Sequence, residues 1–266
     1  MTAPAAGSVP VSVVIAAHNE ADQIEACVRS VAWADEVLVV ENDSSDDTLE
    51  RARAAGATVF SNPFRSIGAQ RNAALARARH PWVFVLDADE RGTPELGAEV
   101  ARRIVERGPE AYRVPRRNWF MGREIRHSGW NRDRPVRLFR SHLRYDERPV
   151  HEHVITNAEP GLLNEALLHQ PYANLGEYFE KLGRYSRDWA QQNHERGRRV
   201  WLLTLLVRPQ ARFLTTLVLR GGFRDGWQGV VISALAGVSV ASKYAHLWTL
   251  QHAGRTDGSA NDAWPR

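Results

Sequence analysis

The chain has 266 residues, of which 43% are hydrophobic and 25% charged, a composition typical of one large globular domain or of one domain with a substantial appendage. Cys27 is the single cysteine, which excludes an intramolecular disulfide and a cysteine-cluster metal site and fits a reducing compartment. Residues 1–10 contain no basic or strongly apolar stretch, so we expect a flexible lead-in rather than a signal peptide.

The net charge of +4 hides an uneven distribution along the chain. Residues 1–111 contain 11 Lys and Arg against 17 Asp and Glu, whereas residues 112–266 contain 24 against 14. The basic residues of the second part are nearly all arginine and are interleaved with tryptophan. Such a composition suits nucleic acid, an anionic membrane or a phosphorylated substrate, and the plain alternative is a solvated basic face.

Apolar runs and helical patterns alternate through the first 90 residues, with strands expected at residues 11–17, 36–43, 57–60 and 82–86. This alternation predicts a mostly parallel α/β sheet covered by helices, in a domain that spans residues 11–170. Ligands of such sheets bind at the carboxyl ends of the strands. The polar residues expected at that edge are Asn19, Glu20, Glu41, Asn42, Asp43, Asp87 and Asp89. The chain lacks the Gly-x-Gly-x-x-Gly turn and the Walker lysine loop, so a nucleotide would be held by carboxylates and a metal.

Asp87 and Asp89 follow the buried run of residues 82–86 directly. Side chains two positions apart on an extended segment point the same way, so both carboxylates can face one target. Carboxylate oxygens suit Mg²⁺ or Mn²⁺, and such a metal usually accompanies a diphosphate. The alternative is that these carboxylates solvate a turn before the helix that Thr93 and Pro94 open as N-cap and first residue.

The pattern changes after Gly108. Residues 111–117 and 135–140 alternate apolar and basic residues, as half-buried strands do, and the aromatic-rich segment 118–130 between them is expected to be a loop that shapes a substrate pocket.

Residues 171–253 are predicted to form a helical C-terminal region, followed by a disordered tail over 254–266. The apolar stretches 201–207, 213–219 and 229–242 are each shorter than the ~20 residues of a membrane-spanning helix. Flanking Arg, Trp and Tyr residues favour a segment that lies in the membrane interface. The alternative is a helical cap packed on the catalytic domain.

Four motifs in this order resemble those of the family 2 glycosyltransferases with the GT-A fold. They are the first strand with Asn19-Glu20, the segments 41–48 and 68–72, and Leu86 to Glu90. Segments 115–122, 127–130, 136–139, 150–152 and 185–190 resemble the bacterial β-glucosyltransferases of the lipopolysaccharide inner core. The resemblance covers roughly residues 11–250. It implies an inverting enzyme that uses a nucleotide-diphospho-sugar, here a UDP-hexose with glucose expected, and Mg²⁺ or Mn²⁺.

The resemblance also implies residue roles. Asp87 and Asp89 correspond to the Asp-x-Asp motif, in which the second aspartate usually binds the metal. The expected donor-binding residues are Glu20, Glu41, Asn42, Asp43, Arg71, Asn72 and Asp87. Glu41 stands where most members have aspartate and Asp43 where many have glycine, so the pocket for the nucleotide base departs from the family pattern. Trp119, Trp130 and Asp133 are expected in the acceptor pocket.

The general base must reach the acceptor hydroxyl on the side opposite the diphosphate. The candidates after the metal motif are Asp133, Asp146, Glu147, His151 and Glu152. Glu152 follows a Pro-Val break and is flanked by two histidines, so we expect Glu152 as the base and His151 as the residue that orients it. The alternative is that Glu152 and the histidines only brace one another.

The sequence therefore predicts transfer of a hexose to a lipid-linked or lipopolysaccharide-core glycan, by an enzyme bound peripherally to the inner face of the cytoplasmic membrane. Two other classes stay open, a nucleotidyltransferase and a catalytically silent nucleotide-binding module. A nucleotidyltransferase would carry a Gly-rich loop with a lysine, and residues 11–30 contain no lysine. Nucleic acid is not expected as a partner, because the arginines form no recognisable nucleic-acid-binding motif.

Overall fold

The computed structural model describes residues 8–146, 148, 152–172 and 174–253. The chain divides into two compact units. The first comprises Met1–Trp119 and Arg132–Pro171, and the second comprises Phe120–Asn131 and Tyr172–Arg266. The second unit thus takes in a short segment from the middle of the chain.

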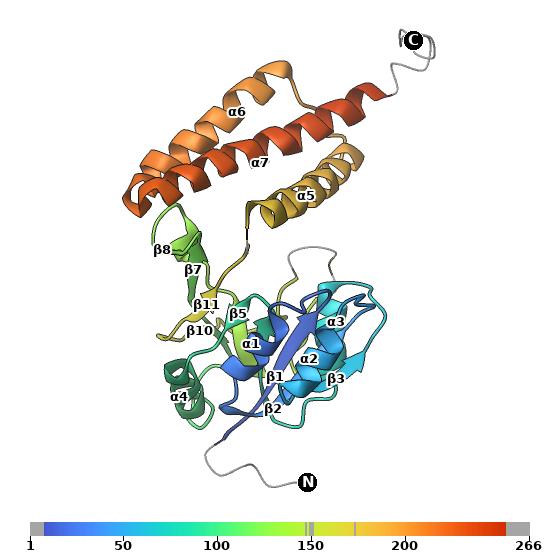
Figure 1. Cartoon of the computed structure of the whole chain (residues 1–266), viewed down its shortest axis with the longest axis vertical. Coiled ribbons are helices and arrows are strands. Elements are labelled where there is room, and N and C mark those ends of the chain that lie inside the picture. The colour runs from blue at the N-terminus through green and yellow to red at the C-terminus, as the bar shows by residue number, and fades with distance from the viewer. Residues whose placement is uncertain (1–7, 147, 149–151, 173, 254–266) are drawn as a thin grey trace. The chain divides into compact units, whose positions relative to one another are not determined.

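The first unit is built on a seven-stranded sheet with the order β10-β6-β9-β4-β1-β2-β3. Figure 1 labels its strands β1, β2, β3 and β10. Strands β4, β1, β2 and β3 run parallel to one another, and β9 runs antiparallel to both β4 and β6. The strands are β1 (Val9–Ala17), β2 (Ala34–Glu41), β3 (Thr58–Ser61), β4 (Trp82–Asp87), β6 (Ala111–Arg113), β9 (Val136–Arg140) and β10 (Gly161–Leu162). The helices of this unit are α1 (Ile24–Ser30), α2 (Thr48–Ala54), α3 (Ile67–Leu75) and α4 (Pro94–Arg103). The predicted mostly parallel α/β sheet covered by helices is confirmed.

Two apolar clusters lie on the two faces of this sheet, because successive side chains of a strand point to opposite faces. One cluster contains Val13 and Ile15 of β1 and is completed by α1 and α4. The other contains Val14 and is completed by Ala74 and Leu75 of α3. Burial on both faces explains why these strands read as unbroken apolar runs.

Helix α4 begins as the sequence predicts. The Thr93 hydroxyl accepts a hydrogen bond from the backbone N–H of Leu96 at 3.2 Å, and Pro94 takes the first helical position. This fixed start determines where the turn after Asp87 must end.

A second sheet has the order β5-β11-β7-β8. Its strands are β5 (Glu90–Arg91), β11 (Leu167–His169), β7 (Arg116–Phe120) and β8 (Arg123–Ile125). The expectation of an irregular loop over residues 118–130 is therefore wrong for its first part, which forms a β-hairpin. Met121 (φ 48°) and Gly122 (φ 76°) form the two-residue turn, and positive φ at both positions matches the right-handed twist of the flanking strands.

The second unit contains the long helices α5 (Leu175–Glu195), α6 (Leu202–Leu214) and α7 (Gly226–His252). Helix α6 continues into the π-helical turn η2 (Thr215–Leu219), and the 3-10 turn η3 (Gly222–Asp225) leads into α7. The turn packs tightly on α7, since a Cβ added at Gly229 would lie 1.8 Å from the carbonyl oxygen of Gly222. The N-terminus of α5 is capped by Asn174, which accepts a hydrogen bond from the N–H of Glu177 at 3.0 Å.

These helices correct the expected lengths of the apolar stretches. Leu202–Leu219 forms 18 continuous helical residues and Gly222–His252 spans 31, so each is long and apolar enough to cross a membrane by length and composition alone. Polar residues interrupt the apolar runs in the sequence, but the helices continue through Pro209 and Lys243.

Candidate active site

The polar residues predicted at the sheet edge do lie there. Strands β4, β1 and β2 are parallel neighbours, so Asp87, the turn after Ala17 and the turn after Glu41 are found at one edge. The register pairs Ala16 with Asp87 and Ala17 with Glu41.

Hydrogen bonds join the turn after β1 to the turn after β2. Asn19 (φ 55°) and Asp43 (φ 48°) adopt the left-handed conformation that short polar residues tolerate. The side chain of Asn19 accepts a hydrogen bond from the N–H of Ser45 at 2.8 Å, and His18 Nδ1 donates to the backbone oxygen of Asn42 at 2.6 Å. These contacts fix the two turns to each other at the edge of the sheet.

Glu41 is buried, and both of its carboxylate oxygens accept hydrogen bonds from neighbouring residues. Its carboxylate accepts hydrogen bonds from the N–H of Ser44 and from the hydroxyl of Ser61, the latter at 2.9 Å. The backbone N–H of Glu20 donates to the Thr48 hydroxyl at 2.8 Å. Of the predicted donor-binding residues in this part, Asn42 is half-buried and Asp43 is exposed.

Asp87 is surrounded by three arginines. Its Oδ1 pairs with Arg71 at 2.5 Å, and its Oδ2 pairs with Arg116 at 3.1 Å and with Arg137. Desolvation alone would raise the pKa of Asp87, but the guanidinium groups of Arg137, Arg71 and Arg116 outweigh it and hold the pKa well below its ordinary value. Asp87 is therefore a permanent anion at physiological pH.

Glu90 completes this cluster from a fully buried position. One carboxylate oxygen accepts the backbone N–H of Asp87 at 2.8 Å, and the other pairs with Arg116 at 2.5 Å and Arg137 at 3.0 Å. Burial would lower the pKa of Arg137, but Asp87 and Glu90 raise it well above its ordinary value. The cluster therefore consists of fixed, mutually compensating charges.

Arg71 joins the Asp-x-Asp motif to Glu152, whose Oε1 lies 2.5 Å from the second guanidinium nitrogen of Arg71. The structure thus brings three predicted residues, Asp87, Arg71 and Glu152, into one chain of ion pairs. Asp133 pairs with Arg116 at 2.8 Å and belongs to the same network. His151, the predicted orienting residue, lies outside the described residues.

Asn72 has a bracing contact. Its amide nitrogen donates to the backbone oxygen of Tyr145 at 2.9 Å, and its amide oxygen accepts the N–H of Tyr145 at the same distance. Arg71 lies over the Tyr145 ring, 5.0 Å from its centroid. Helix α3 and the segment at Tyr145 are therefore fixed together beside Arg71.

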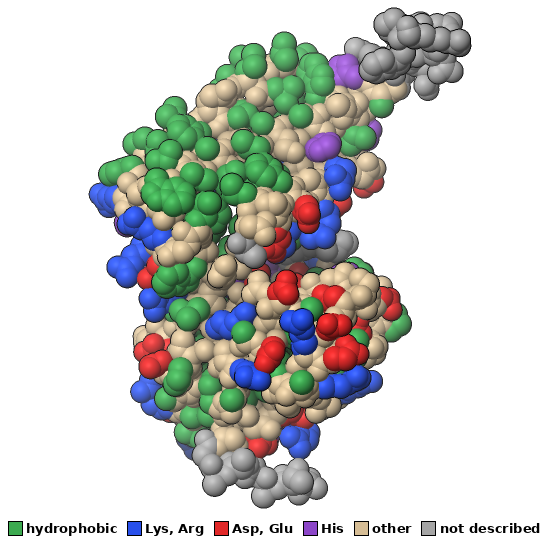
Figure 2. Space-filling view, in the orientation of Figure 1, with side chains coloured by type: hydrophobic (Ala, Val, Ile, Leu, Met, Phe, Trp, Pro, Cys, Tyr) green, Lys and Arg blue, Asp and Glu red, His purple; other side chains and the backbone are tan. Residues whose placement is uncertain are grey.

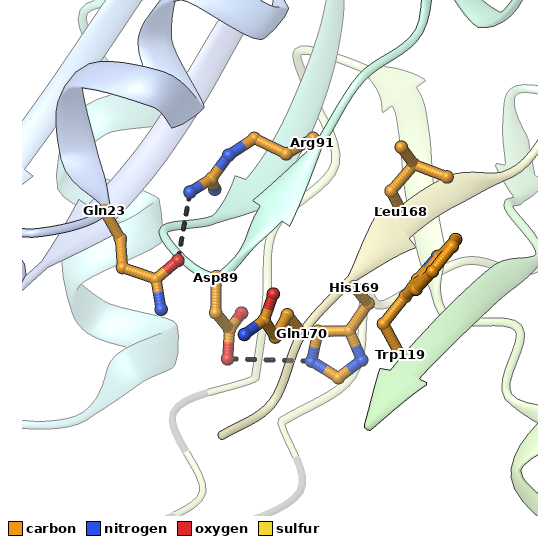
Figure 3. Close-up of a pocket in the computed structure, with 7 residues that line it drawn as sticks. All are labelled: Gln23, Asp89, Arg91, Trp119, Leu168, His169 and Gln170. Carbon is orange, nitrogen blue, oxygen red and sulfur yellow. Dashed lines mark hydrogen bonds and ion pairs between the residues drawn. The ribbon is translucent and has the colours of Figure 1, made fainter. Parts of the chain in front are cut away.

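Asp89 has different surroundings from Asp87, so the two carboxylates do not share one target as the spacing predicted. Asp89 Oδ2 lies 3.6 Å from Nε2 of His169, on the short strand β11 (Figure 3). His169 Nδ1 donates a hydrogen bond to Oδ1 of Asn118 at 2.6 Å. In the neutral ring this leaves the lone pair on Nε2, which faces the carboxylate oxygen.

A pocket opens beside this pair (Figure 3). It is lined by Gln23, Asp89, Arg91, Trp119, Leu168, His169 and Gln170. Arg91 donates a hydrogen bond to the side chain of Gln23 at 3.0 Å. Trp119, predicted in the acceptor pocket, is part of this lining. Trp130 belongs to the second unit, where its ring centroid lies 6.0 Å from that of Phe120.

Sequence reasoning missed Arg116, Arg137, Glu90 and His169 as site residues. Arg116 and Arg137 lie in segments that carry the family resemblance, and their alternation with apolar residues marked them as strand residues only. No local sequence pattern indicates His169, because it is 80 positions from Asp89 in the chain. It approaches Asp89 only through the pairing of β11 with β5, in which His169 lies opposite Glu90.

A model of the family described as glycosyl transferase family 2 matches residues 12–162. The lipopolysaccharide core biosynthesis glycosyltransferase LpsC of Rhizobium meliloti (strain 1021) is 28% identical over 264 residues, which cover 96% of this chain and 97% of that protein. The uncharacterized glycosyltransferase RP128 of Rickettsia prowazekii (strain Madrid E) is 26% identical, with 85% of this chain and 82% of that protein covered.

Among solved structures, the chain is similar to glucosyl-3-phosphoglycerate synthase from Mycobacterium tuberculosis, crystallised with Mn²⁺, uridine diphosphate and phosphoglyceric acid. The identity is 28%, the match covers 42% of this chain and 44% of that one, and the TM-score is 0.37. This value is too low to transfer the ligands of that enzyme to the present site.

Proposed function

The chain belongs to glycosyl transferase family 2, and we propose that it transfers a hexose from a UDP-hexose to a lipid-linked or lipopolysaccharide-core glycan with inversion at the anomeric carbon. Glucose is the expected hexose. The full-length similarity to a lipopolysaccharide core glycosyltransferase supports the acceptor class. We further propose that the enzyme works at the inner face of the cytoplasmic membrane, where such an acceptor would be presented.

The observation that carries this proposal is the pair formed by Asp89 and His169. Oδ2 of Asp89 and Nε2 of His169 lie 3.6 Å apart beside the pocket, and in the neutral ring with Nδ1 donating to Asn118 both atoms carry a lone pair that a cation can accept. Adjacent ligands of an octahedral Mg²⁺ lie about 3.0 Å apart, because the ligand bonds are about 2.1 Å long, so the two atoms would have to approach each other by about 0.6 Å to hold such an ion. Among the described residues no group of three or more His, Cys, Asp or Glu side chains could hold a metal ion. We therefore propose that Asp89 and His169 supply two ligands to Mg²⁺ or Mn²⁺ and that the diphosphate of the donor supplies others.

Asp87 is better suited to a positioning role than to metal binding, because both of its oxygens are engaged by guanidinium groups. When bound, the metal supplies positive charge that stabilises the leaving diphosphate. The donor is proposed to lie along the edge formed by Glu20, Glu41, Asn42, Asp43, Arg71 and Asn72.

Glu152 is proposed as the general base. Its pairing with Arg71, which also pairs with Asp87, holds the Glu152 carboxylate beside the Asp-x-Asp motif. The acceptor hydroxyl would transfer its proton to the Glu152 carboxylate while its oxygen attacks C1 of the sugar. The bond from C1 to the diphosphate oxygen breaks as the new bond forms, so a single displacement inverts C1.

Release of UDP from UDP-glucose tests this function, measured with Mn²⁺ and a lipopolysaccharide-core acceptor. Glu152→Gln should lower transfer about 10²- to 10⁴-fold, the range expected for loss of a general base, while metal-dependent donor binding persists. Glu159→Gln is the matched control, because Glu159 is exposed and pairs only loosely with Arg113 at 3.5 Å.

Near-normal turnover of Glu152→Gln would move the role of base to Asp133 or His151. The absence of UDP release from the unaltered protein, across several nucleotide sugars, would favour a silent nucleotide-binding module. Formation of a nucleotide sugar from a nucleotide and a sugar phosphate would favour a nucleotidyltransferase.

A further inference from the structure

The surface of the second unit carries a long apolar stripe. On α6 and η2, Leu203, Val207, Leu214 and Val218 are all exposed, with 70% of Leu203 accessible. Their spacing of four and seven residues places them on one side of the helix. Hydrophobic side chains gather over the part of the surface that α6 and α7 form (Figure 2).

Helix α7 repeats this arrangement. Trp227, Val230, Ala234 and Val238 are exposed and recur at intervals of three and four. Near the turn between the helices, Leu219 is 80% exposed and Phe223 is 57% exposed. An apolar surface of this extent is uncommon on a protein surrounded by water alone and indicates a partner.

The charges of the same region identify the partner. Residues 196–252 contain seven arginines and one lysine but a single carboxylate, Asp225, which is buried. At 100° per residue, Arg208 and Arg212 lie roughly opposite the stripe of Leu203 and Val207. Such an amphipathic arrangement, apolar on one side and cationic on the other, is typical of helices that lie in the interface of an anionic membrane.

We propose that the hairpin of α6, η2 and α7 docks on an anionic phospholipid bilayer through this apolar stripe and lies in the headgroup interface. This proposal builds on the membrane location proposed above and names the surface, its orientation and the lipid charge. A crossing of the bilayer is disfavoured, because Arg208 and Arg212 fall near the middle of Leu202–Leu219 and would enter the hydrocarbon core.

The docked hairpin would also be fixed to residues 126–128. Asp225 accepts hydrogen bonds from the backbone N–H of Arg126 at 3.1 Å and of His127 at 3.0 Å, and from the Ser128 hydroxyl at 3.0 Å. The N–H of Ser128 donates to the backbone oxygen of Arg220 at 3.0 Å. The segment that precedes Trp130 therefore moves with the hairpin as one body.

Flotation of the full chain with phosphatidylglycerol vesicles tests the proposal. The protein should float with these vesicles at low salt and much less with phosphatidylcholine vesicles, since anionic headgroups attract the arginines. Leu203→Glu combined with Val218→Glu should lower the partition coefficient at least tenfold. Val105→Glu, at an exposed apolar position of the first unit, is the matched control and should bind as the unaltered protein does.

Unchanged flotation of the Leu203→Glu, Val218→Glu variant would overturn the proposal. The proposal would also be overturned if the unaltered protein did not float but formed a dimer, and if this variant were monomeric. The apolar stripe would then join two copies of the chain. Resistance of the bound protein to alkaline carbonate would show a crossing hairpin and overturn the in-plane orientation. Asp89→Asn should float normally, so failure of catalysis and failure of docking are separable.

Discussion

The edge of the sheet and the helical hairpin differ in whether their arginines are paired with carboxylates. At the edge, Arg71, Arg116 and Arg137 are each paired with at least one carboxylate at 3.1 Å or less. In the hairpin, Arg208 donates to the Tyr244 hydroxyl at 2.7 Å, and no ion pair to a carboxylate is found for it within the described part of the chain. Arginines that are paired with carboxylates indicate a preformed site. Arginines without a carboxylate partner, beside exposed apolar residues, are typical of a surface that binds a membrane.

The contrast is sharpest within the Asp-x-Asp motif itself. Both oxygens of Asp87 are engaged by guanidinium groups, whereas Asp89 has the imidazole of His169 as its neighbour, at 3.6 Å. Replacement by asparagine should therefore have different effects at the two positions. We expect Asp89→Asn to lower catalysis and Asp87→Asn to lower stability.

The largest expected effect is that of Asp89→Asn on transfer. Loss of the anionic metal ligand should lower kcat/KM about 10²- to 10⁴-fold, since a bound metal contributes several kcal/mol to transition-state stabilisation. Mn²⁺-dependent donor binding, measured by titration calorimetry, should weaken in parallel, and His169→Gln should do the same. Asp22→Asn, at an exposed aspartate, is the control. Unaltered metal dependence in Asp89→Asn would show that Asp89 does not bind the metal.

Asp87→Asn should instead destabilise the first unit. Removal of one partner from a buried ionic cluster costs several kcal/mol, and we expect about 2 to 4 kcal/mol here because the Asp87 side chain is 31% exposed. The loss should appear as a lower midpoint of chemical denaturation. A variant as stable as the unaltered protein would show that the three arginines find compensation elsewhere.

The pH dependence of this loss follows from the depressed pKa of Asp87. In the unfolded chain the group has its ordinary pKa of 3.8, and in the folded chain the pKa is lower. Its stabilising contribution is therefore complete above pH 3.8 and is lost as the pH falls toward the folded pKa. The stability difference between the unaltered protein and Asp87→Asn should accordingly be constant near neutral pH and shrink below about pH 4.

Much of the first unit follows from the sequence, because buried parallel strands and their polar ends leave local signals. The runs before Asn19, Asn42 and Asp87 predicted the edge of the sheet, and Thr93-Pro94 predicted the start of α4. The arginine cluster could not be predicted, since Arg116 and Arg137 reach Asp87 from strands that meet it only after the sheet forms. The approach of His169 to Asp89 is hidden for the same reason.

The hairpin was harder to predict for a different reason. Arg208-Pro209 reads as a helix end, because proline lacks an N–H and charges interrupt the apolar run. The helix continues because α7 packs along it, with the Pro209 carbonyl 3.0 Å from the position a Cβ would take on Gly237. Tertiary packing thus overrides the local signal, and the helices become longer than the sequence indicates.

The smallest expected effect belongs to Asp225, the carboxylate that the hairpin does contain. Asp225→Asn keeps the shape but removes the charge that accepts the N–H groups of Arg126 and His127. Charge-assisted hydrogen bonds contribute about 1.5 to 3 kcal/mol, so these two amides should exchange hydrogen about 10- to 100-fold faster. Exposed Asp188 on α5 provides the control Asp188→Asn, which should leave this exchange unchanged. If exchange at Arg126 and His127 is also unchanged in Asp225→Asn, the packing of Gly229 against Gly222 holds the turn without the carboxylate, and the link between residues 126–128 and the hairpin rests on backbone contacts alone.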